Sequence, residues 1–389
     1  MASSPLSAEA LPTFKGRPGW EFTDISALHL ADYRPVTAED PAAAPTGELW
    51  PLDGAGAELP AGVIVAPIQQ AAQEHGELLR RHLGTLIAEE DDVFVALNGA
   101  GYRDGTFVYV PRGVALEAPI SLTSVHAAAG TLLNQRTLIV VEDGAQAEVW
   151  EQYLSAEEEL DGVVNVVTEL IVGENAHLRY VCGQGLSETS WIFGAQRAEV
   201  GRDARLDWVA LGFGSARGHV RMQTRLGGQG ANARVTGAYA THGRQHIDFD
   251  TTQEHAAENT TSDLAFRGVL QDRSSAVWKG NIIVDPGAQK TDAFQESRNL
   301  LLSKRAHADA IPGLEIQAND VRCTHAAAIA QVDPEQLFYL RSHGLPEPVA
   351  KRLVIEGFLS ALVERFEQGP VREVLAATLE HRLALVLGA

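Results

Sequence analysis

The chain has 389 residues, 45% of them hydrophobic and 21% charged, which is typical of a globular protein with two or three structural units. Its formal net charge of −20 argues against a nucleic-acid partner, because tracking phosphates needs a basic face. We expect neither a membrane span nor a secretion signal, since the sequence lacks a run of about 18 apolar residues and Met1 to Phe14 carries no leader pattern. Only Cys182 and Cys323 are present, so we expect no disulfide framework and predict a cytoplasmic protein.

Residues 1–100 combine helical patterns with a connector. The stretch from Pro41 to Gly62 is rich in Pro, Ala and Gly, which predicts a surface connector. Apolar residues then recur at spacings of three and four, which predicts one helix from about Gln69 to Glu90. These apolar residues are Leu78, Leu79, Leu83, Leu86 and Ile87.

A repeat dominates the middle of the chain, from about Gly101 to Gln331. Short Val/Ile/Leu-rich runs alternate with Gly, Asp and Asn turns, and a turn residue followed by alanine recurs at intervals of 31, 28 and 27 residues. A shared marker at this period predicts a stacked β-solenoid, because every coil must turn sharply at the same place. The alternative is a β-sandwich, whose strands recur every 8–12 residues or so without a longer marker. The marker alanines are Ala145, Ala176, Ala204 and Ala231, with looser echoes at Ala276, Ala288 and Ala306.

Helical patterns return beyond Asp333. Asp333 precedes Pro334, which predicts an N-cap followed by proline in the first turn, and Gly344 predicts the end of that helix. Two further helices are predicted, one over about 347–366 and one after Gly369-Pro370, and their broad apolar stripes must pack on the solenoid or on another protein. We therefore divide the chain into residues 1–100, 101–331 and 332–389.

Familiar catalytic motifs are missing from the sequence. It contains no phosphate-binding P-loop, no G-x-S-x-G elbow and no H-E-x-x-H zinc motif. Gly228, Gly230 and Ala233 match the loose dinucleotide fingerprint, but a strand pattern follows where a helix is needed. A β-helix enzyme acting on carbohydrates is the rival class, and it would need paired carboxylates or calcium ligands, which do not stand out.

Three histidines could be metal ligands or structural residues. On one strand, His242 and His246 would face the same side, near Asp248 or Asp250, and such groups can bind metal. Hydrogen bonding within a stacked sheet is the interpretation that we favour for them and for His255. The sequence alone does not assign their roles.

Cys323 and His325 are the best local candidates for iron–sulfur chemistry. They stand two residues apart, so on a strand both would face one side. Clusters usually take four ligands, mostly thiolates, which two cysteines cannot supply, so a partner would have to share the ligation. From spacing alone, a half-buried cysteine beside a structural histidine is the commoner arrangement.

Ordered blocks over about 330 residues resemble the SufD family. The strongest comprises Leu314 to Ile316, Asp320 to His325 with Cys323, Asp333, and Leu337 to Gly344. Other matching blocks are Leu11 to Thr13, Trp20 to Asp24, Asp92 to Asn98, Val110 to Gly113, His246 to Ser262, Gly287 to Asp292 and Asn299 to Ser303. The chain departs from the family at Ala326 to Ala330, which replace glycines. The sister SufB family is the nearest alternative, but its Glu-His-Glu run is missing here.

The resemblance implies a right-handed parallel β-helix core with α-helical regions at both ends. It also implies a non-catalytic scaffold subunit for iron–sulfur cluster assembly, joined to a SufB-type subunit through the β-helix and to a SufC-type ABC ATPase through the C-terminal helices. When alone, such a subunit can pair with a second copy as a homodimer, and the sequence leaves homodimer and heterodimer open. The resemblance places His325, and secondarily Cys323, near the SufB contact as ligands of a transient cluster or iron, with none bound tightly by this chain alone.

Overall fold

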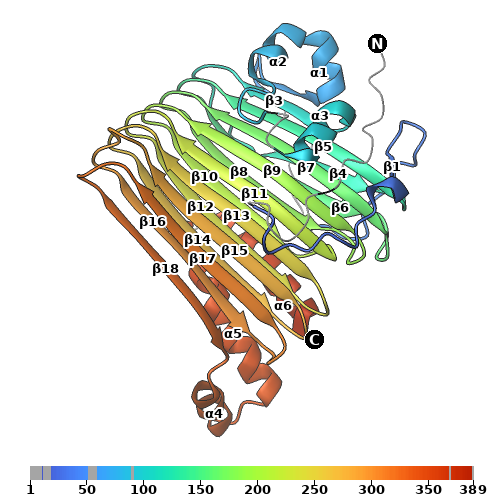
Figure 1. Ribbon diagram of the computed structural model, residues 1–389, viewed down its shortest axis with the longest axis vertical. Coiled ribbons are helices and arrows are strands. Elements are labelled where there is room, and N and C mark those ends of the chain that lie inside the picture. The colour runs from blue at the N-terminus through green and yellow to red at the C-terminus, as the bar shows by residue number, and fades with distance from the viewer. Residues whose placement is uncertain (1–10, 12–18, 51–58, 89–91, 368, 388–389) are drawn as a thin grey trace.

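A two-sheet parallel solenoid forms the body of the protein (Figure 1). The computed structural model describes residue 11 and residues 19–50, 59–88, 92–367 and 369–387. Helices from the N-terminal region lie at one end of the solenoid, and the C-terminal helices lie against one sheet and beyond the other end (Figure 1). The predicted parallel β-helix with helical regions at both ends is confirmed. Among the described residues, no helix is long and apolar enough to cross a membrane.

Sheet A has ten strands in the described part of the chain, ordered β17-β15-β13-β11-β9-β7-β5-β3-β2, with β1 paired to β5. All its pairs are parallel except β2 with β3. Its strands are β1 Arg34–Pro35, β2 Ile64–Pro67, β3 Thr106–Val110, β5 Thr131–Val141, β7 Gly162–Val172, β9 Trp191–Val200, β11 Arg217–Leu226, β13 His246–His255, β15 Ser275–Val284 and β17 His307–Ile316.

Sheet B faces sheet A and has eight described strands, all parallel, ordered β18-β16-β14-β12-β10-β8-β6-β4. Its strands are β4 Ile120–His126, β6 Gln146–Ser155, β8 His177–Gly185, β10 Arg205–Gly212, β12 Asn232–Thr241, β14 Thr261–Leu270, β16 Asp292–Leu301 and β18 Arg322–Gln331. Alternate side chains of both sheets point inward and form one core. Its largest fully buried members include Trp208, Trp278, Tyr180 and Phe266.

The four marker alanines occupy one corner of successive coils, as predicted. Each is at most 2% exposed and directly precedes a strand of sheet B, and the residues after them are in register. The residue before each alanine has a positive φ between 53° and 74°. This left-handed backbone favours Gly, Asn and Asp, which explains the recurring turn residue. The four turn residues are Gly144, Asn175, Asp203 and Gly230.

The looser echoes of the repeat do not share this corner. Ala276 lies within β15 of sheet A, and Ala306 directly precedes β17 of the same sheet. In the next two coils the corner position is taken by buried Thr260 and Thr291, whose hydroxyl oxygens lie 3.3 Å apart. Extending the alanine marker past Ala231 was therefore wrong, because threonine replaces alanine where the corner can form a hydroxyl contact.

Three short helices precede the solenoid: α1 Ile68–Glu74, α2 Gly76–His82 and α3 Val93–Gly101. The single helix predicted from Gln69 to Glu90 is wrong. The helix breaks at His75, whose ψ is 30°, and helical structure ends before Gly84, whose φ is +77°. The end of that prediction, residues 89–90, lies outside the described residues.

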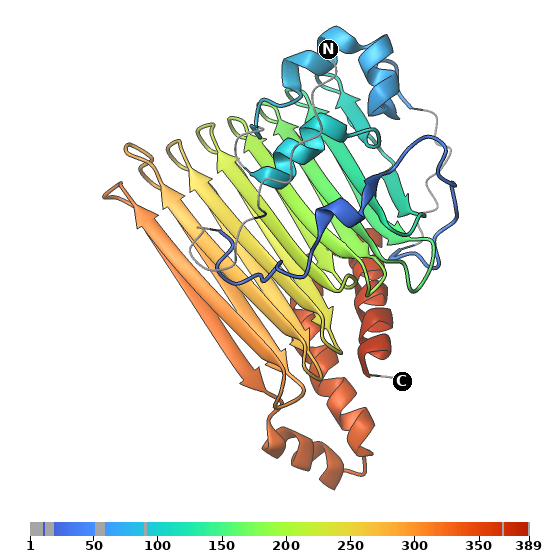
Figure 2. The same cartoon turned by 45° about the vertical axis from the view of Figure 1, so that its right-hand side comes forward.

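The chain before α1 forms an N-terminal strap, residues 19–36, which crosses the outer face of sheet A (Figure 2). It includes a short 3-10 helix at Leu30–Asp32 and strand β1. The predicted surface connector from Pro41 to Gly62 is only partly exposed, because Leu49 and Trp50 are buried against sheet B. Residues 51–58 of that connector, and residues 12–13 of the matching N-terminal block, lie outside the described part.

Three helices follow the solenoid: α4 Pro334–Ser342, α5 Glu347–Val363 and α6 Pro370–Leu387. Asp333 caps α4 as predicted, since its carboxylate accepts a hydrogen bond from the Glu335 amide at 2.9 Å. Helices α5 and α6 pack their apolar residues on the outer face of sheet B, whereas α4 has no buried residue. The predicted stripes of α5 and α6 thus pack largely on the chain's own solenoid.

Candidate functional site at the open end of the solenoid

Cys323 and His325 both lie on β18, the last strand of sheet B. β18 pairs in parallel with β16, and Cys323 stands opposite Ala293 while His325 stands opposite Gln295. Ala293 and Gln295 are buried between the sheets, so the matching positions on β18 continue the interior rows of the solenoid. Because no further coil follows, His325 is exposed and Cys323 is half-buried.

The interior row that ends at His325 changes character along the solenoid. In earlier coils it is apolar, in the next to last coil it is the amide of Gln295, and in the last coil it is the imidazole of His325. The apolar members are Val149, Tyr180, Trp208, Val235 and Leu264. Such a row buries hydrophobic side chains where coils stack and places polar groups where stacking ends.

The two ends of the solenoid differ. At the first end, β2 pairs antiparallel with β3. At the other end, β17 and β18 are the outermost strands of their sheets in the described chain, with no further strand paired to either. Ile316 is 42% exposed there and Ile329 is 44% exposed. Unpaired edge strands with exposed apolar residues readily pair with another chain.

The surroundings of the Cys323 thiol raise its pKa and so favour the protonated form. Burial raises the pKa of Cys323, and the nearby Asp292 carboxylate raises it further. Asp292 itself forms an ion pair with Arg322. Thiolate is the form that binds metals, so Cys323 would ligate only where a metal ion displaces its proton.

Within the described residues, no group of three or more His, Cys, Asp and Glu side chains could hold a metal ion. Cys323 and His325 alone would leave half of a four-coordinate iron without protein ligands. Any further ligands for iron at this end would therefore have to come from another molecule.

The earlier histidine candidates prove to be hydrogen-bonded residues of the solenoid. His255 is buried, and its two ring nitrogens lie 2.8 Å from the Thr260 hydroxyl and 2.9 Å from the Ser262 hydroxyl. Burial lowers the pKa of His255 to about 4, so its ring is neutral at physiological pH. This supports the structural interpretation for His255.

His242 and His246 do not share a strand, so the expectation that they face one side was wrong. β12 ends at Thr241, and the chain turns at Gly243, where φ is +59°, before β13 begins at His246. His242 instead lies 2.8 Å from the carboxylate of Glu188. His246 and Asp248 do share the outer face of β13, where both contact the N-terminal strap.

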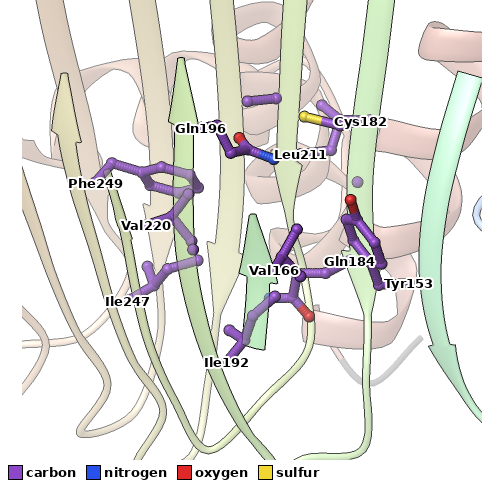
Figure 3. Close-up of a pocket in the computed structure, with 13 residues that line it drawn as sticks. Tyr153, Val166, Cys182, Gln184, Ile192, Gln196, Leu211, Val220, Ile247 and Phe249 are labelled. Atoms are coloured by element: carbon purple, nitrogen blue, oxygen red, sulfur yellow. The ribbon is translucent and has the colours of Figure 1, made fainter. Parts of the chain in front are cut away.

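Cys182 points into the solenoid, beside a cavity of about 30 Å³ between the sheets (Figure 3). The cavity has a mainly apolar lining that includes Ile247 and Phe249, with Gln184 and Gln196 among its polar residues. Burial raises the pKa of Cys182 to about 12. A thiol that is buried and protonated is chemically inert.

Sequence reasoning missed Gln295, and it missed the residues that fix the strap. Gln295 Nε2 donates to the carbonyl oxygens of Gly280 and Gly313, both at 3.1 Å, and so ties β16 to two strands of sheet A. Its position opposite His325 follows only from the register of β16 with β18. That register cannot be read from the sequence, because the coils differ in length. Thr23 lies in a matching block, but no local pattern connects it with Asp248, 225 residues away.

The fold and its open end define a class: a β-solenoid protein with C-terminal helices that leaves its last coil uncovered beside a thiol and an imidazole. The family model "SUF system FeS cluster assembly, SufBD core domain" matches residues 124–358, and the model of the SufBD N-terminal region matches residues 46–122. The chain therefore belongs to the SufBD family of iron–sulfur cluster assembly proteins.

Curated relatives support the SufD-like character of the chain. It is 34% identical over 325 residues to the iron–sulfur cluster assembly protein SufD of Bacillus subtilis, covering 83% of this chain and 74% of that protein. A SufBD family protein of Mycobacterium tuberculosis is 30% identical over 294 residues, 74% of this chain and 73% of the relative. A Synechocystis family member is 26% identical over 387 residues, 92% of this chain and 85% of its own.

Proposed function

We propose that this chain is a non-catalytic scaffold subunit of a SufBCD-type complex and that its open solenoid end binds a SufB-type subunit. The observation that carries the proposal is the unpaired edge of β17 and β18, which exposes Ile316 and Ile329. A second solenoid could pair with both edges and bury both isoleucines. When the chain is alone, a second copy would take the same place and give a homodimer.

The cargo of the complex is a nascent iron–sulfur cluster or iron. His325 would be the principal ligand from this chain and Cys323 the second, and the SufB-type subunit would supply the others. This division is supported by the donor set of the open end, one imidazole and one thiol on adjacent inward positions of β18. Imidazole and thiolate both suit iron. Two ligands on an exposed edge would hold the cargo only transiently.

The SufC-type ATPase would dock on α4 and the adjoining start of α5. Phe338 is 74% exposed and Tyr339 is 62% exposed on α4, while Val349 and Leu353 are each 44% exposed on α5. Exposed apolar residues gathered on two neighbouring helices are typical of a protein interface. The other face of α5 packs on sheet B, so the exposed residues of α5 would be held in a fixed position relative to the solenoid.

Co-expression with the two partners tests the proposal. Ile316→Glu with Ile329→Glu should abolish co-purification of the SufB-type subunit, since two carboxylates would be buried at the contact, while the ATPase stays bound. Leu59→Glu is the matched control, because Leu59 is 43% exposed but far from the open end in the chain. Full retention of the SufB-type subunit by the double variant would show that the interface lies elsewhere.

A further inference from the structure

The N-terminal strap crosses the outer face of sheet A (Figure 2), and a chain of polar contacts fastens it to β13 and β15. The Thr23 hydroxyl lies 2.6 Å from Asp248 Oδ2 and 3.2 Å from His246 Nε2, both on β13. His246 Nδ1 lies 2.8 Å from the Ser275 hydroxyl on β15. Thr23 is 1% exposed and Asp248 is 3% exposed, so the contact between them is shielded from water, while His246 is half-buried.

The direction of each hydrogen bond follows from the donors available. An ionised Asp248 can only accept, so the single hydroxyl proton of Thr23 goes to its carboxylate. Thr23 Oγ1 must then accept from His246 Nε2, which therefore carries the ring proton. His246 Nδ1 is left as an acceptor for the Ser275 hydroxyl, and the whole chain is satisfied by a neutral imidazole.

His219 on β11 lies beside the same carboxylate oxygen of Asp248 that Thr23 contacts. Its Nδ1 lies 3.1 Å from Asp248 Oδ2, and its ring packs on the strap residue Trp20 in a tilted arrangement with centroids 4.3 Å apart. Burial opposes charge on both partners, but their mutual attraction outweighs it, which raises the pKa of His219 and lowers the pKa of Asp248. The ion pair therefore supplies the acceptor that Thr23 needs.

We propose that this arrangement is a proton-controlled latch, which holds the strap on sheet A while His246 is neutral and His219 is charged, and which opens on acidification. A proton on His246 would place a second positive charge in a nearly enclosed site. The charged groups around it are Asp24 on the strap, Arg217 and His219 on β11, Asp248 on β13 and Asp309 on β17.

The pH dependence follows from the difference between the closed and open strap. With the strap closed, burial lowers the pKa of His246, and the positive charges of Arg217 and His219 lower it further. Together they outweigh the upward effect of Asp248, so the pKa lies below its ordinary value. With the strap released, the ring meets water and regains that value. Protons thus bind the open form more tightly, and falling pH favours opening. The raised pKa of His219 sets a limit on the high-pH side. Charged His219 stabilises the closed strap, and this stabilisation is lost as the pH rises through the pKa of His219.

Hydrogen exchange of the strap, followed by mass spectrometry on the full chain, tests the latch. After correction for the intrinsic rate of amide exchange, the fraction of molecules with an open strap should rise by up to about tenfold for each pH unit below the ordinary His246 pKa of about 6.5. The rise should end at the lower pKa that His246 has while the strap is closed. Amides of β10 and β12 report on the integrity of the solenoid and should stay protected throughout.

Three variants separate the latch from general loosening. Thr23→Val should leave the strap open at all pH values, and Thr23→Ser, which keeps the hydroxyl, should behave like the parent protein. His246→Gln keeps an amide donor for Thr23 without a titrating ring, so its strap should stay closed on acidification. Acid opening of the His246→Gln strap equal to that of the parent, or pH-independent exchange in the parent, would overturn the proposal.

Discussion

His325 stands opposite Gln295 on the neighbouring strand, so an exposed imidazole continues a row whose previous member is completely buried. The interior of the solenoid therefore ends in a group that the described residues of the chain leave exposed. The same holds for Cys323 above Ala293. A histidine and a cysteine left open at the end of a stacked core are accessible to a partner subunit, which is the basis of the proposed scaffold role.

The alanine corner should tolerate no larger side chain. Ala204→Leu should lower the free energy of unfolding by ~1–3 kcal/mol, because the coils above and below leave no room for added carbons. Ala328→Leu, on an exposed position of β18, is the control and should change it by less than about 0.5 kcal/mol. Urea unfolding of both variants measures the difference, and equal stabilities would contradict close stacking at the corner.

Gly183 should be required where the connector crosses sheet B. A Cβ at Gly183 would lie 2.7 Å from Leu49 Cδ1 and 2.8 Å from the Trp50 ring, so Gly183→Ala should cost ~1–3 kcal/mol by displacing both residues. Gly357 on α5 has no atom within 4 Å of the corresponding position. Gly357→Ala should therefore stabilise the chain by ~0.5–1 kcal/mol. Thermal unfolding would show opposite shifts for the two variants, and a stabilising Gly183→Ala would refute the contact.

The two cysteines should differ sharply in reactivity. Cys182 is buried with a pKa of about 12, so it carries almost no thiolate at pH 8, whereas Cys323 is half-buried on an open edge. Iodoacetamide should label Cys323 in the native protein and Cys182 only after unfolding, as mass spectrometry of peptides would show. Native labelling of Cys182 at the rate of Cys323 would mean that the solenoid core opens to solvent.

The ATPase surface is better tested by substitution than by removing the C-terminal helices. α5 and α6 cover apolar residues of sheet B, so truncation after Gln331 would expose that core. Phe338→Ala with Tyr339→Ala should instead abolish ATPase co-purification and change the unfolding free energy by less than about 0.5 kcal/mol, since both side chains are mostly exposed. Undiminished ATPase binding would place the dock elsewhere.

The sequence predicted the features that repeat locally. The corner alanines could be found because a left-handed turn residue followed by alanine recurs in four successive coils, and the Asp333-Pro334 cap because it is a short-range signal. The end of helical structure before Gly84 could not, since the apolar spacing continues past it to Leu86 and Ile87. The contact between Thr23 and Asp248 could not be predicted either. It depends on which residues of β13 point outward and on the path of the strap across the sheet, and no local pattern encodes that path.

Cluster assembly in the co-expressed complex tests the central claim most directly, with iron and sulfide content measured on the purified assembly. His325→Ala should lower cluster yield by about tenfold or more, since even outer-shell partners of a metal ligand commonly contribute that much, while all subunits still co-purify. Cys323→Ala should cause a smaller loss, and Cys182→Ala, the buried control, should be close to neutral. Normal cluster yield from His325→Ala in an intact complex would contradict the account and leave this chain a purely structural partner.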